Sequence, residues 1–473
     1  MKNYSIYSAG RFVETSESFS IINPATSEII ATSYFAGKDE FENSVIKALS
    51  LESELKNMPS FLKYEILMEI AYSIKAEKQY LGEILSSESG KPIKLALGEI
   101  ERALQTFIVA AEESKRIAGE VMQIDWTSVA AGKEGIVKYF PVGLVAGIAP
   151  FNFPLNLAVH KIAPAIAAGC PIILKPATST PLSTLELARI IDKTALPKGA
   201  VSILPMNRQT GNLLVTDPRF KLLSFTGSPE VGWKMKTDAG KKKVVLELGG
   251  NAGVIVAPSA NLQTAVNKCV SGGFSYSGQV CIHTQRIFIH TSIFDAFANA
   301  FVEKAQQMKM GHPLDPLTDI SAMIDEDNAI RVEEWVNEAI NSGAKLLCGG
   351  KRNATFFEPT VLTQTKSEMK VCAMEIFGPV VVLEPYDDFN SAIQQINNSR
   401  YGLQAGVFTD SLHEMNLAFA ELEVGGVMIN EVPTFRVDHM PYGGIKDSGL
   451  GREGVKYAML DMMEAKILVK ELR

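Results

Sequence analysis

Cysteine is scarce in this sequence, with five residues in a chain of 473. No two of them form a Cys-x-x-Cys pair, the spacing typical of zinc sites and redox disulfides. Their odd number and wide separation also argue against a disulfide framework. We therefore expect no metal site, and any functional cysteine should act alone as a thiol. The five are Cys170, Cys269, Cys281, Cys348 and Cys372.

Long hydrophobic runs are also absent. No apolar stretch reaches the roughly 18 residues of a membrane-spanning helix, and the longest candidate, 142–154, is interrupted by glycine, proline and asparagine. Residues 1–5 lack the apolar stretch and cleavage site of a secretory signal. We expect a cytoplasmic protein with no membrane partner.

No long run of charges of one sign occurs either. The 46 lysines and arginines and 53 acidic residues are mixed along the chain and leave a net charge of -7, so nothing favours nucleic acid as a partner. The hydrophobic fraction of 46% and charged fraction of 21% are typical of folded proteins. A small-molecule substrate is the better default, and the length predicts two or three packed units.

The apolar pattern predicts an α/β fold. Between residues 39 and 119 apolar residues recur at helical spacing, whereas 121–139 alternates in part and predicts an excursion of strands. Short apolar runs then alternate with segments long enough for helices, which predicts a parallel, nucleotide-binding type of sheet. These runs lie at 144–148, 172–175, 201–204, 222–226 and 244–246. A second strand and helix series follows at 253–426, and 465–470 forms a strand-like tail.

Two motifs contain candidate catalytic side chains. Cys281 lies in Gly-Gln-Val-Cys-Ile-His, after glycines that allow close backbone approach. A lone cysteine is more often a small core residue, so other residues must support a role for it. Upstream, Val-Leu-Glu-Leu-Gly-Gly-Asn places Glu247 at the end of an apolar strand. Burial there would raise its pKa and suit it to act as a general base.

Three further motifs complete the pattern. Asn152 stands between Phe151 and Phe153 just after a predicted buried strand. The stretch 224–229, Ser-Phe-Thr-Gly-Ser-Pro, predicts a strand that turns into a helix whose N-terminus could face a phosphate. The last motif is Glu-Ile-Phe-Gly-Pro at 375–379.

Together and in this order, the five motifs resemble the aldehyde dehydrogenase superfamily over essentially the whole chain, and 440–449 is similar to the closing signature of that family. The resemblance implies a Rossmann-type cofactor domain at 1–120 and 140–246 and an α/β catalytic domain at 247–439. It also implies a small β oligomerisation arm at 121–139 and 459–473, which adds strands to a neighbouring subunit. A homodimer or homotetramer is therefore expected.

The resemblance also assigns chemical roles. Cys281 would attack the aldehyde carbon, and the Asn152 side chain and the Cys281 backbone N–H would stabilise the oxyanion. Hydride would leave for the nicotinamide, and Glu247 would activate water to cleave the resulting thioester. Relatives that pass the acyl group to coenzyme A tend to lack this glutamate, so its presence favours hydrolysis to the acid.

The expected cofactor is NADP or NAD. Many NAD-preferring relatives have a glutamate where this chain has Thr178, and that acid would repel a 2′-phosphate, so its absence makes NADP acceptable. The residues that the resemblance places around the cofactor are Phe151, Lys175, Thr178, Gly227, Ser228, Leu248, Glu375 and Phe377.

Arg102, His160 and Arg436 match positions that line the aldehyde entrance in relatives. The two arginines match anion-binding residues of non-phosphorylating glyceraldehyde-3-phosphate dehydrogenases, and arginine forks suit carboxylate, phosphate or sulfonate. Val280 replaces a third arginine of those enzymes, and 435–441 looks closer to lactaldehyde and short-chain semialdehyde dehydrogenases. We expect a short aldehyde with an anion or hydroxyl, of the lactaldehyde, semialdehyde, phosphono-aldehyde or sulfo-aldehyde type; the alternative for each arginine is a structural salt bridge.

Two other functions use the same fold. One is a thiol esterase or acyltransferase with the same nucleophile, and the other is a non-catalytic structural protein. The retained cofactor motifs argue against the first, and the intact set of Cys281, Glu247, Asn152 and Glu375 argues against the second.

Overall fold

The first large sheet contains the apolar runs expected to be strands. The computed structural model describes residues 2–472. In it, five parallel strands form the middle of an eight-stranded sheet, and short antiparallel strands extend both edges. The central strands read as continuous apolar runs because a parallel sheet is covered on both faces. In spatial order the strands are β24 (Gly449–Leu450), β12 (Lys243–Glu247), β11 (Leu222–Thr226), β8 (Val145–Ile148), β9 (Ile172–Lys175), β10 (Val201–Ile203), β2 (Ile6–Ser8) and β3 (Arg11–Val13).

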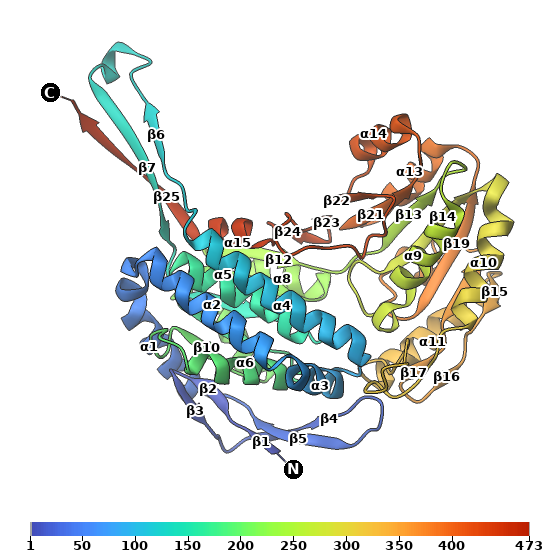
Figure 1. The fold of residues 1–473 in the computed structure, drawn as a ribbon, viewed down its shortest axis with the longest axis horizontal. Coiled ribbons are helices and arrows are strands. Elements are labelled where there is room, and N and C mark those ends of the chain that lie inside the picture. The colour runs from blue at the N-terminus through green and yellow to red at the C-terminus, as the bar shows by residue number, and fades with distance from the viewer. Residues whose placement is uncertain (1, 473) are drawn as a thin grey trace.

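Helices cover both faces of this sheet and bury two cores. Alternate residues of the same strands enter different cores: Val145 packs on the side of α2 to α6, and Ala146 packs on the side of α1, α7 and α8. In Figure 1 the long helices α2 and α4 lie side by side across one face. The helices are α1 (Lys38–Asn57), α2 (Ser60–Ala76), α3 (Lys78–Ser89), α4 (Ile93–Ser114), α5 (Pro154–Ala168), α6 (Leu182–Asp192), α7 (Arg208–Thr216) and α8 (Pro229–Asp238).

A second, seven-stranded sheet forms the other half of the body (Figure 1). It is parallel except at β15, and helices again cover both faces. Its strands, in spatial order, are β15 (Lys345–Cys348), β18 (Thr360–Thr363), β19 (Val380–Tyr386), β14 (Thr284–His290), β13 (Ala252–Val256), β21 (Gln404–Phe408) and β22 (Gly426–Ile429). Its helices are α9 (Leu262–Phe274), α10 (Phe294–Gln306), α11 (Glu326–Asn341), α12 (Lys370–Ala373), α13 (Phe389–Asn397) and α14 (Leu412–Glu421).

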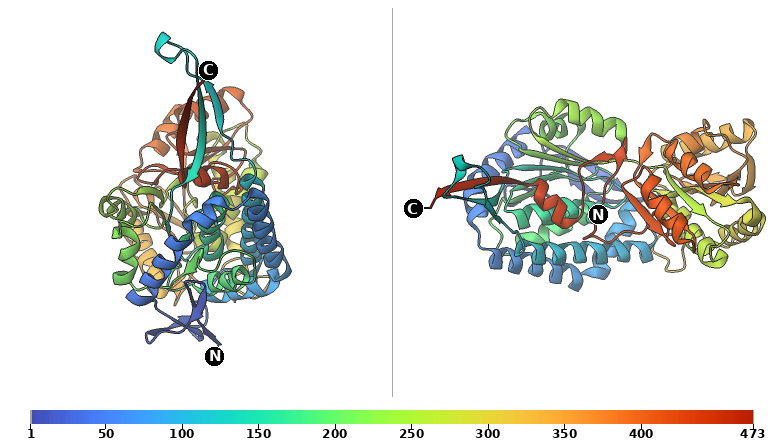
Figure 2. Two further views of the ribbon diagram at one scale, coloured as in Figure 1. Left: turned by 90° about the vertical axis from the view of Figure 1, so that its left-hand side faces the viewer. Right: turned by 90° about the horizontal axis from the view of Figure 1, so that it is seen from above.

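A three-stranded arm projects from the body (Figures 1 and 2). It joins β6 (Glu120–Gln123) and β7 (Lys133–Pro141) to the C-terminal strand β25 (Met463–Glu471), which pairs with β7 along its whole length. The helix α15 (Val455–Asp461) packs on α5 and leads into β25. The structure thus confirms strands in both expected arm segments, while the exact domain boundaries stay a prediction.

The remaining elements are short. The sheet of β1 (Lys2–Tyr4), β5 (Ile29–Tyr34) and β4 (Ser18–Ile22) lies near the N-terminus, and two hairpin-like pairs join β16 (Arg352–Asn353) to β17 (Phe356–Phe357) and β20 (Tyr401–Gly402) to β23 (Ile445–Lys446). Single 3₁₀ turns occur at Ser128–Ala130, Ser275–Gly278 and Thr291–Ile293. Between residues 2 and 472, no helix combines the length and apolar character needed to cross a membrane.

Candidate active site

One cavity of about 720 Å³ collects every catalytic and cofactor residue expected from the sequence. Its walls come from the carboxyl ends of β8, β9, β11 and β12 in the first sheet, and from loops of the second. Ligands of open α/β sheets bind at this edge of the strands. The expected residues that line it are Phe151, Asn152, Lys175, Thr178, Gly227, Ser228, Glu247, Leu248, Cys281, Glu375 and Phe377.

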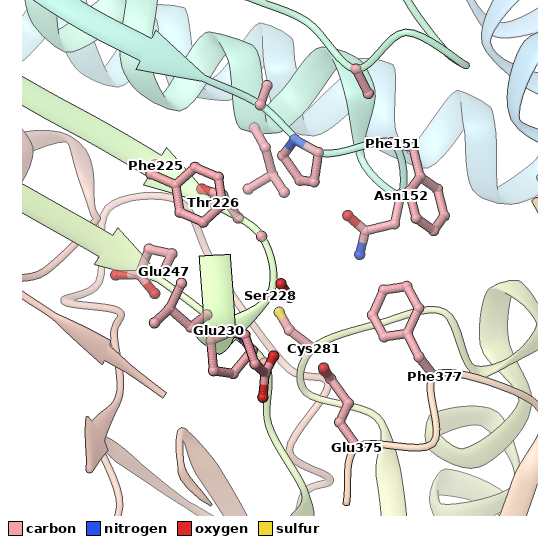
Figure 3. Close-up of a pocket in the computed structure, with 18 of the residues that line it drawn as sticks. Phe151, Asn152, Phe225, Thr226, Ser228, Glu230, Glu247, Cys281, Glu375 and Phe377 are labelled. Carbon is pink, nitrogen blue, oxygen red and sulfur yellow. The ribbon is translucent and has the colours of Figure 1, made fainter. Parts of the chain in front are cut away.

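A strained turn presents Cys281 to the cavity. The preceding Gly278 has φ of +69°, and a Cβ there would lie 2.0 Å from the carbonyl oxygen of Gly378, so only glycine fits. The other four cysteines are buried, whereas Cys281 is partly exposed. Figure 3 shows its sulfur and the Asn152 amide both facing the middle of the pocket.

The Cys281 thiol is not poised as a thiolate in this structure. Burial raises the pKa of the Cys281 thiol to about 11. The hydrogen bond with the Tyr442 hydroxyl, 3.1 Å from Sγ, partly offsets this increase. The nearby Glu375 carboxyl adds to the increase. The surrounding protein groups therefore do not by themselves favour the thiolate, because desolvation outweighs the favourable contacts.

Asn152 is held by a buried scaffold that sequence reasoning missed. Its Nδ2 donates to the Gln279 carbonyl at 3.0 Å, which ties it to the turn before Cys281. The backbone carbonyl of Asn152 accepts a hydrogen bond from Lys91 Nζ at 2.7 Å, and Lys91 forms a buried ion pair with Glu99. Glu99 also accepts from two backbone N–H groups at the start of α5. The loop that carries Asn152 is thus fixed from both sides.

Glu247 ends β12 and is 4% exposed. Both carboxylate oxygens are buried without a hydrogen-bond partner among the described residues. Burial raises its pKa well above the ordinary range, and the negative charge of Glu453 raises it further. A Cβ at Gly443 would lie 2.8 Å from Glu247 Oε1, so glycine leaves room for this carboxyl. The raised pKa expected from its apolar flanks is confirmed in direction.

A buried cluster of charges lies next to the candidate catalytic groups. Arg436 donates to Glu453 at 2.9 Å, and Lys161 donates to the same carboxylate at 3.2 Å. Although burial alone would raise the pKa of Glu453, the two cations lower it to about 2. The guanidinium of Arg436 also lies 3.7 Å from the centre of the Tyr442 ring, and its Nε has no hydrogen-bond partner within residues 2–472.

The expected substrate residues join this cluster rather than the cavity wall. Arg102, His160 and Arg436 are not among the lining residues of the cavity, and all three meet at Asp438 or Glu453. Arg102 Nη2 donates to Asp438 at 2.7 Å, and His160 Nε2 lies 2.8 Å from the same carboxylate. Burial, and then Arg436, lowers the pKa of His160. Each arginine therefore forms a structural salt bridge, which the sequence analysis gave as the alternative to substrate binding.

The other end of the cavity suits a phosphate-bearing cofactor. Burial lowers the pKa of Lys175, and among the described residues its ammonium donates only to the Pro176 carbonyl at 3.4 Å. Within residues 2–472 it therefore has no anionic partner, and it lines this end of the cavity. Ser228 is the N-cap residue of α8, and its side chain makes no capping hydrogen bond, which leaves the helix N-terminus open to an anion. Glu375 accepts from Gly250 N at 3.0 Å, and burial raises its pKa to about 8.

The sequence identified the candidate catalytic residues that line the cavity, but not the residues that support them. Tyr442 lies within 440–449, the stretch similar to the closing signature of the family, to which the sequence assigned no chemical role. Glu453 and Lys91 had no signal, because each acts through residues distant in sequence. The one sequence feature that could have pointed to Glu453 and Lys91 is that each is an ionisable residue next to a glycine.

Comparisons with known proteins agree with this geometry. Residues 12–468 match the model of the aldehyde dehydrogenase family. A 3-sulfolactaldehyde dehydrogenase of Priestia aryabhattai is 42% identical over 474 aligned residues, which span 100% of this chain and 99% of the relative.

Solved structures agree as well. Aldehyde dehydrogenase 21 of Physcomitrella patens, in complex with its reaction product succinate, is 45% identical with a TM-score of 0.98, over 99% of this chain and 98% of that one. The glyceraldehyde-3-phosphate dehydrogenase GapN of Methanocaldococcus jannaschii, complexed with NADP, is 40% identical with a TM-score of 0.93, over 97% and 100%. The chain belongs to the aldehyde dehydrogenase family, an enzyme family that uses NAD or NADP.

Proposed function

We propose that the protein oxidises a short, anionic aldehyde to the acid with NADP or NAD, through a thioester on Cys281. The observation that carries the proposal is that Cys281, Asn152 and Glu247 line one cavity with the residues expected to hold the cofactor. A nucleophile, a hydrogen-bond donor for the oxyanion and a base on one side of a cofactor cleft are the parts that this reaction needs.

In the first half of the reaction, the Cys281 thiolate attacks the aldehyde carbon, and the C–S bond forms as the carbonyl π electrons move to oxygen. The Asn152 Nδ2 and the Cys281 backbone N–H donate to this oxyanion, which is the charge that develops in the transition state. Lys175, Ser228 and Glu375 would hold the cofactor, which when bound supplies the hydride acceptor. Loss of hydride from the tetrahedral carbon leaves a thioester.

Glu247 acts in the second half. As a carboxylate it takes a proton from water, whose oxygen attacks the thioester carbon; the C–S bond then breaks, and the acid and the Cys281 thiolate are released. A raised pKa suits a base that must hold and release this proton near neutral pH. The glutamate therefore supports hydrolysis, and not acyl transfer to coenzyme A.

The charge cluster supports an anionic substrate. Three cationic side chains, Arg102, Lys161 and Arg436, face two carboxylates with lowered pKa, Asp438 and Glu453, so positive charge is in excess while Glu247 is protonated. The buried Nε of Arg436, which has no hydrogen-bond partner among the described residues, also favours a ligand that accepts a hydrogen bond. Two relatives are associated with short anionic compounds: one is named for 3-sulfolactaldehyde, and the other was solved with its product succinate.

A cytoplasmic homodimer or homotetramer completes the proposal. Five free thiols suit a reducing compartment, and the long apolar strand of the arm suits pairing with another subunit. Thiol esterase chemistry would use the same cysteine, but it gives no reason for the cofactor end of the cavity.

Arg102 offers the test of the substrate class, because its side chain is 30% exposed and its loss should not disrupt the fold. Arg102→Met should reduce kcat/KM for succinate semialdehyde about tenfold or more, as expected for one charge-assisted hydrogen bond of about 1.5–3 kcal/mol. Propionaldehyde, similar in length but uncharged, is the control and should change little. Equal losses for both aldehydes, measured by cofactor absorbance, would show that Arg102 acts only through its salt bridge to Asp438, and would remove it as support for an anionic substrate.

A further inference from the structure

Among the described residues, the side chain of Tyr442 forms a hydrogen bond with the sulfur of Cys281. Its Oη lies 3.1 Å from Sγ, and within residues 2–472 no histidine or lysine makes such a contact with this thiol. The tyrosine is 3% exposed, and its backbone is fixed by a two-way bridge with Glu453, in which Tyr442 N donates at 3.0 Å and Tyr442 O accepts at 2.6 Å. The phenol is therefore held in place beside the sulfur.

We propose that the Tyr442 hydroxyl is a catalytic residue that donates its proton in a hydrogen bond to the Cys281 thiolate and so stabilises the nucleophile. This inference rests on the proposed role of Cys281. It assigns to a neutral phenol the part that a cationic partner plays for many reactive cysteines.

The direction of the hydrogen bond follows from the two groups. A thiol is a weak donor, whereas a phenol donates well and a thiolate accepts well. Burial, and then the neighbouring Cys281, raises the pKa of Tyr442 well above its ordinary value, so the hydroxyl keeps the proton that it must donate. The raised pKa thus favours the protonated phenol, which is the form that can donate to the thiolate.

Arg436 strengthens this donor from behind the ring. Its guanidinium carbon is 3.7 Å from the ring centre, at the face of the phenol. A positive charge there draws electron density from the ring and increases the acidity of the hydroxyl. Glu375 and Glu247 oppose thiolate formation at Cys281, and Arg436 favours it. Tyr442 therefore contacts the Arg436 cation with its ring and the Cys281 sulfur with its hydroxyl.

The test is the reactivity of the thiol, measured without aldehyde oxidation. Wild-type protein and Tyr442→Phe are alkylated with iodoacetamide over a range of pH, and the rate at Cys281 is followed by peptide mass spectrometry. Because only a thiolate reacts, the rate reports its fraction. Tyr442→Phe should shift the midpoint to higher pH and slow alkylation at pH 8 about tenfold, which corresponds to one pKa unit. An unchanged or lower midpoint would overturn the proposal.

Two further variants make the result specific. Tyr386→Phe removes another buried hydroxyl, one that donates to the Val256 carbonyl at 3.4 Å, and should leave the midpoint unchanged. Replacing Tyr442 by 3-fluorotyrosine keeps the hydroxyl but makes it more acidic, so the midpoint should move to lower pH. An unchanged or higher midpoint would contradict the proposal, even if Tyr442→Phe failed to fold.

This experiment also separates the two proposals. If Cys281→Ala still oxidised aldehydes, the proposed mechanism would fail, while the alkylation midpoint would still report the contact between Tyr442 and the thiol. If the midpoint did not respond to Tyr442, the cysteine mechanism would stand without this hydrogen bond.

Discussion

At the scale of single residues, Glu247 combines deep burial with no hydrogen-bond partner among the described residues. Its folded-state pKa is raised above that of the unfolded chain. Its contribution to stability is therefore fully present at pH below the unfolded value and is lost as pH rises through the folded value. The ionised form that the proposed base needs is therefore also the form that destabilises the fold, a cost often found at catalytic positions.

We predict that Glu247→Gln raises the melting temperature by about 1–3 °C more at pH 8 than at pH 5, because the buried wild-type carboxyl ionises only as pH rises through its raised pKa and the amide does not ionise. The gain at pH 5 should be the smaller one, since the raised pKa favours the protonated wild-type carboxyl there. The matched control is Glu453→Gln, whose pKa of about 2 reflects ion pairs, so this change should lower the melting temperature at pH 8. Scanning fluorimetry at both pH values checks the pair, and an equal gain at pH 5 and pH 8 would refute the assignment.

Thr178 determines the cofactor prediction. Thr178→Glu should move the ratio of kcat/KM for NAD and NADP at least about tenfold towards NAD, because a carboxylate near the adenosine 2′ position repels phosphate. Thr178→Gln has the same size without the charge and should shift the ratio far less. Steady-state kinetics with both cofactors decide the matter, and a wild-type enzyme that refuses NADP would already contradict it.

The residues that sequence reasoning could and could not find differ in how they act. Cys281, Asn152 and Glu247 each follow a local motif, so the chain around them was informative. Tyr442 depends on a contact across 161 positions of sequence, which no local pattern encodes. The salt bridges of Arg102 and Arg436 were foreseen only as alternatives, because the positions of Asp438 and Glu453 in space were not predictable.

At the scale of elements, the central strands followed from apolar runs, since β8, β9, β10, β11 and β12 are buried on both faces. The strands at the two edges of this sheet did not follow from such runs. The two-residue strand β24 pairs antiparallel with β12, and β2 and β3 extend the opposite edge from the start of the chain. Such short strands have no periodicity of their own and form because an existing edge offers unpaired N–H and C=O groups.

The arm permits a prediction about assembly. In β25 the apolar residues Ile467, Leu468 and Val469 are each about half exposed in the single chain, which a lone subunit would leave in water. Replacing Ile467 and Val469 by lysine should convert an oligomer to a monomer in analytical ultracentrifugation, with far-UV circular dichroism unchanged. Lys470→Ala alters the same strand without adding charge to an apolar contact, and should sediment as wild type. An unchanged sedimentation coefficient in the double variant would count against the arm as an interface.

At the scale of the whole molecule, the two large sheets meet at the cavity, and each contributes part of the chemistry. The first sheet supplies Asn152, Glu247 and the cofactor end, while Cys281 and Glu375 come from loops around the second. Such a division could be expected from the order of motifs along the chain. The size of the cavity and the buried charges behind it could not, because both depend on how the two sheets pack together.

The central claim is that oxidation passes through an acyl group on Cys281, and one measurement tests it most directly. Glu247→Gln is mixed with succinate semialdehyde and NADP, quenched rapidly and digested, and the Cys281 peptide is weighed by mass spectrometry. The account predicts a succinyl adduct on that peptide, formed with about one equivalent of reduced cofactor per active site, because acylation proceeds and hydrolysis stalls. Continued turnover at the wild-type rate with an unmodified Cys281 peptide would contradict it.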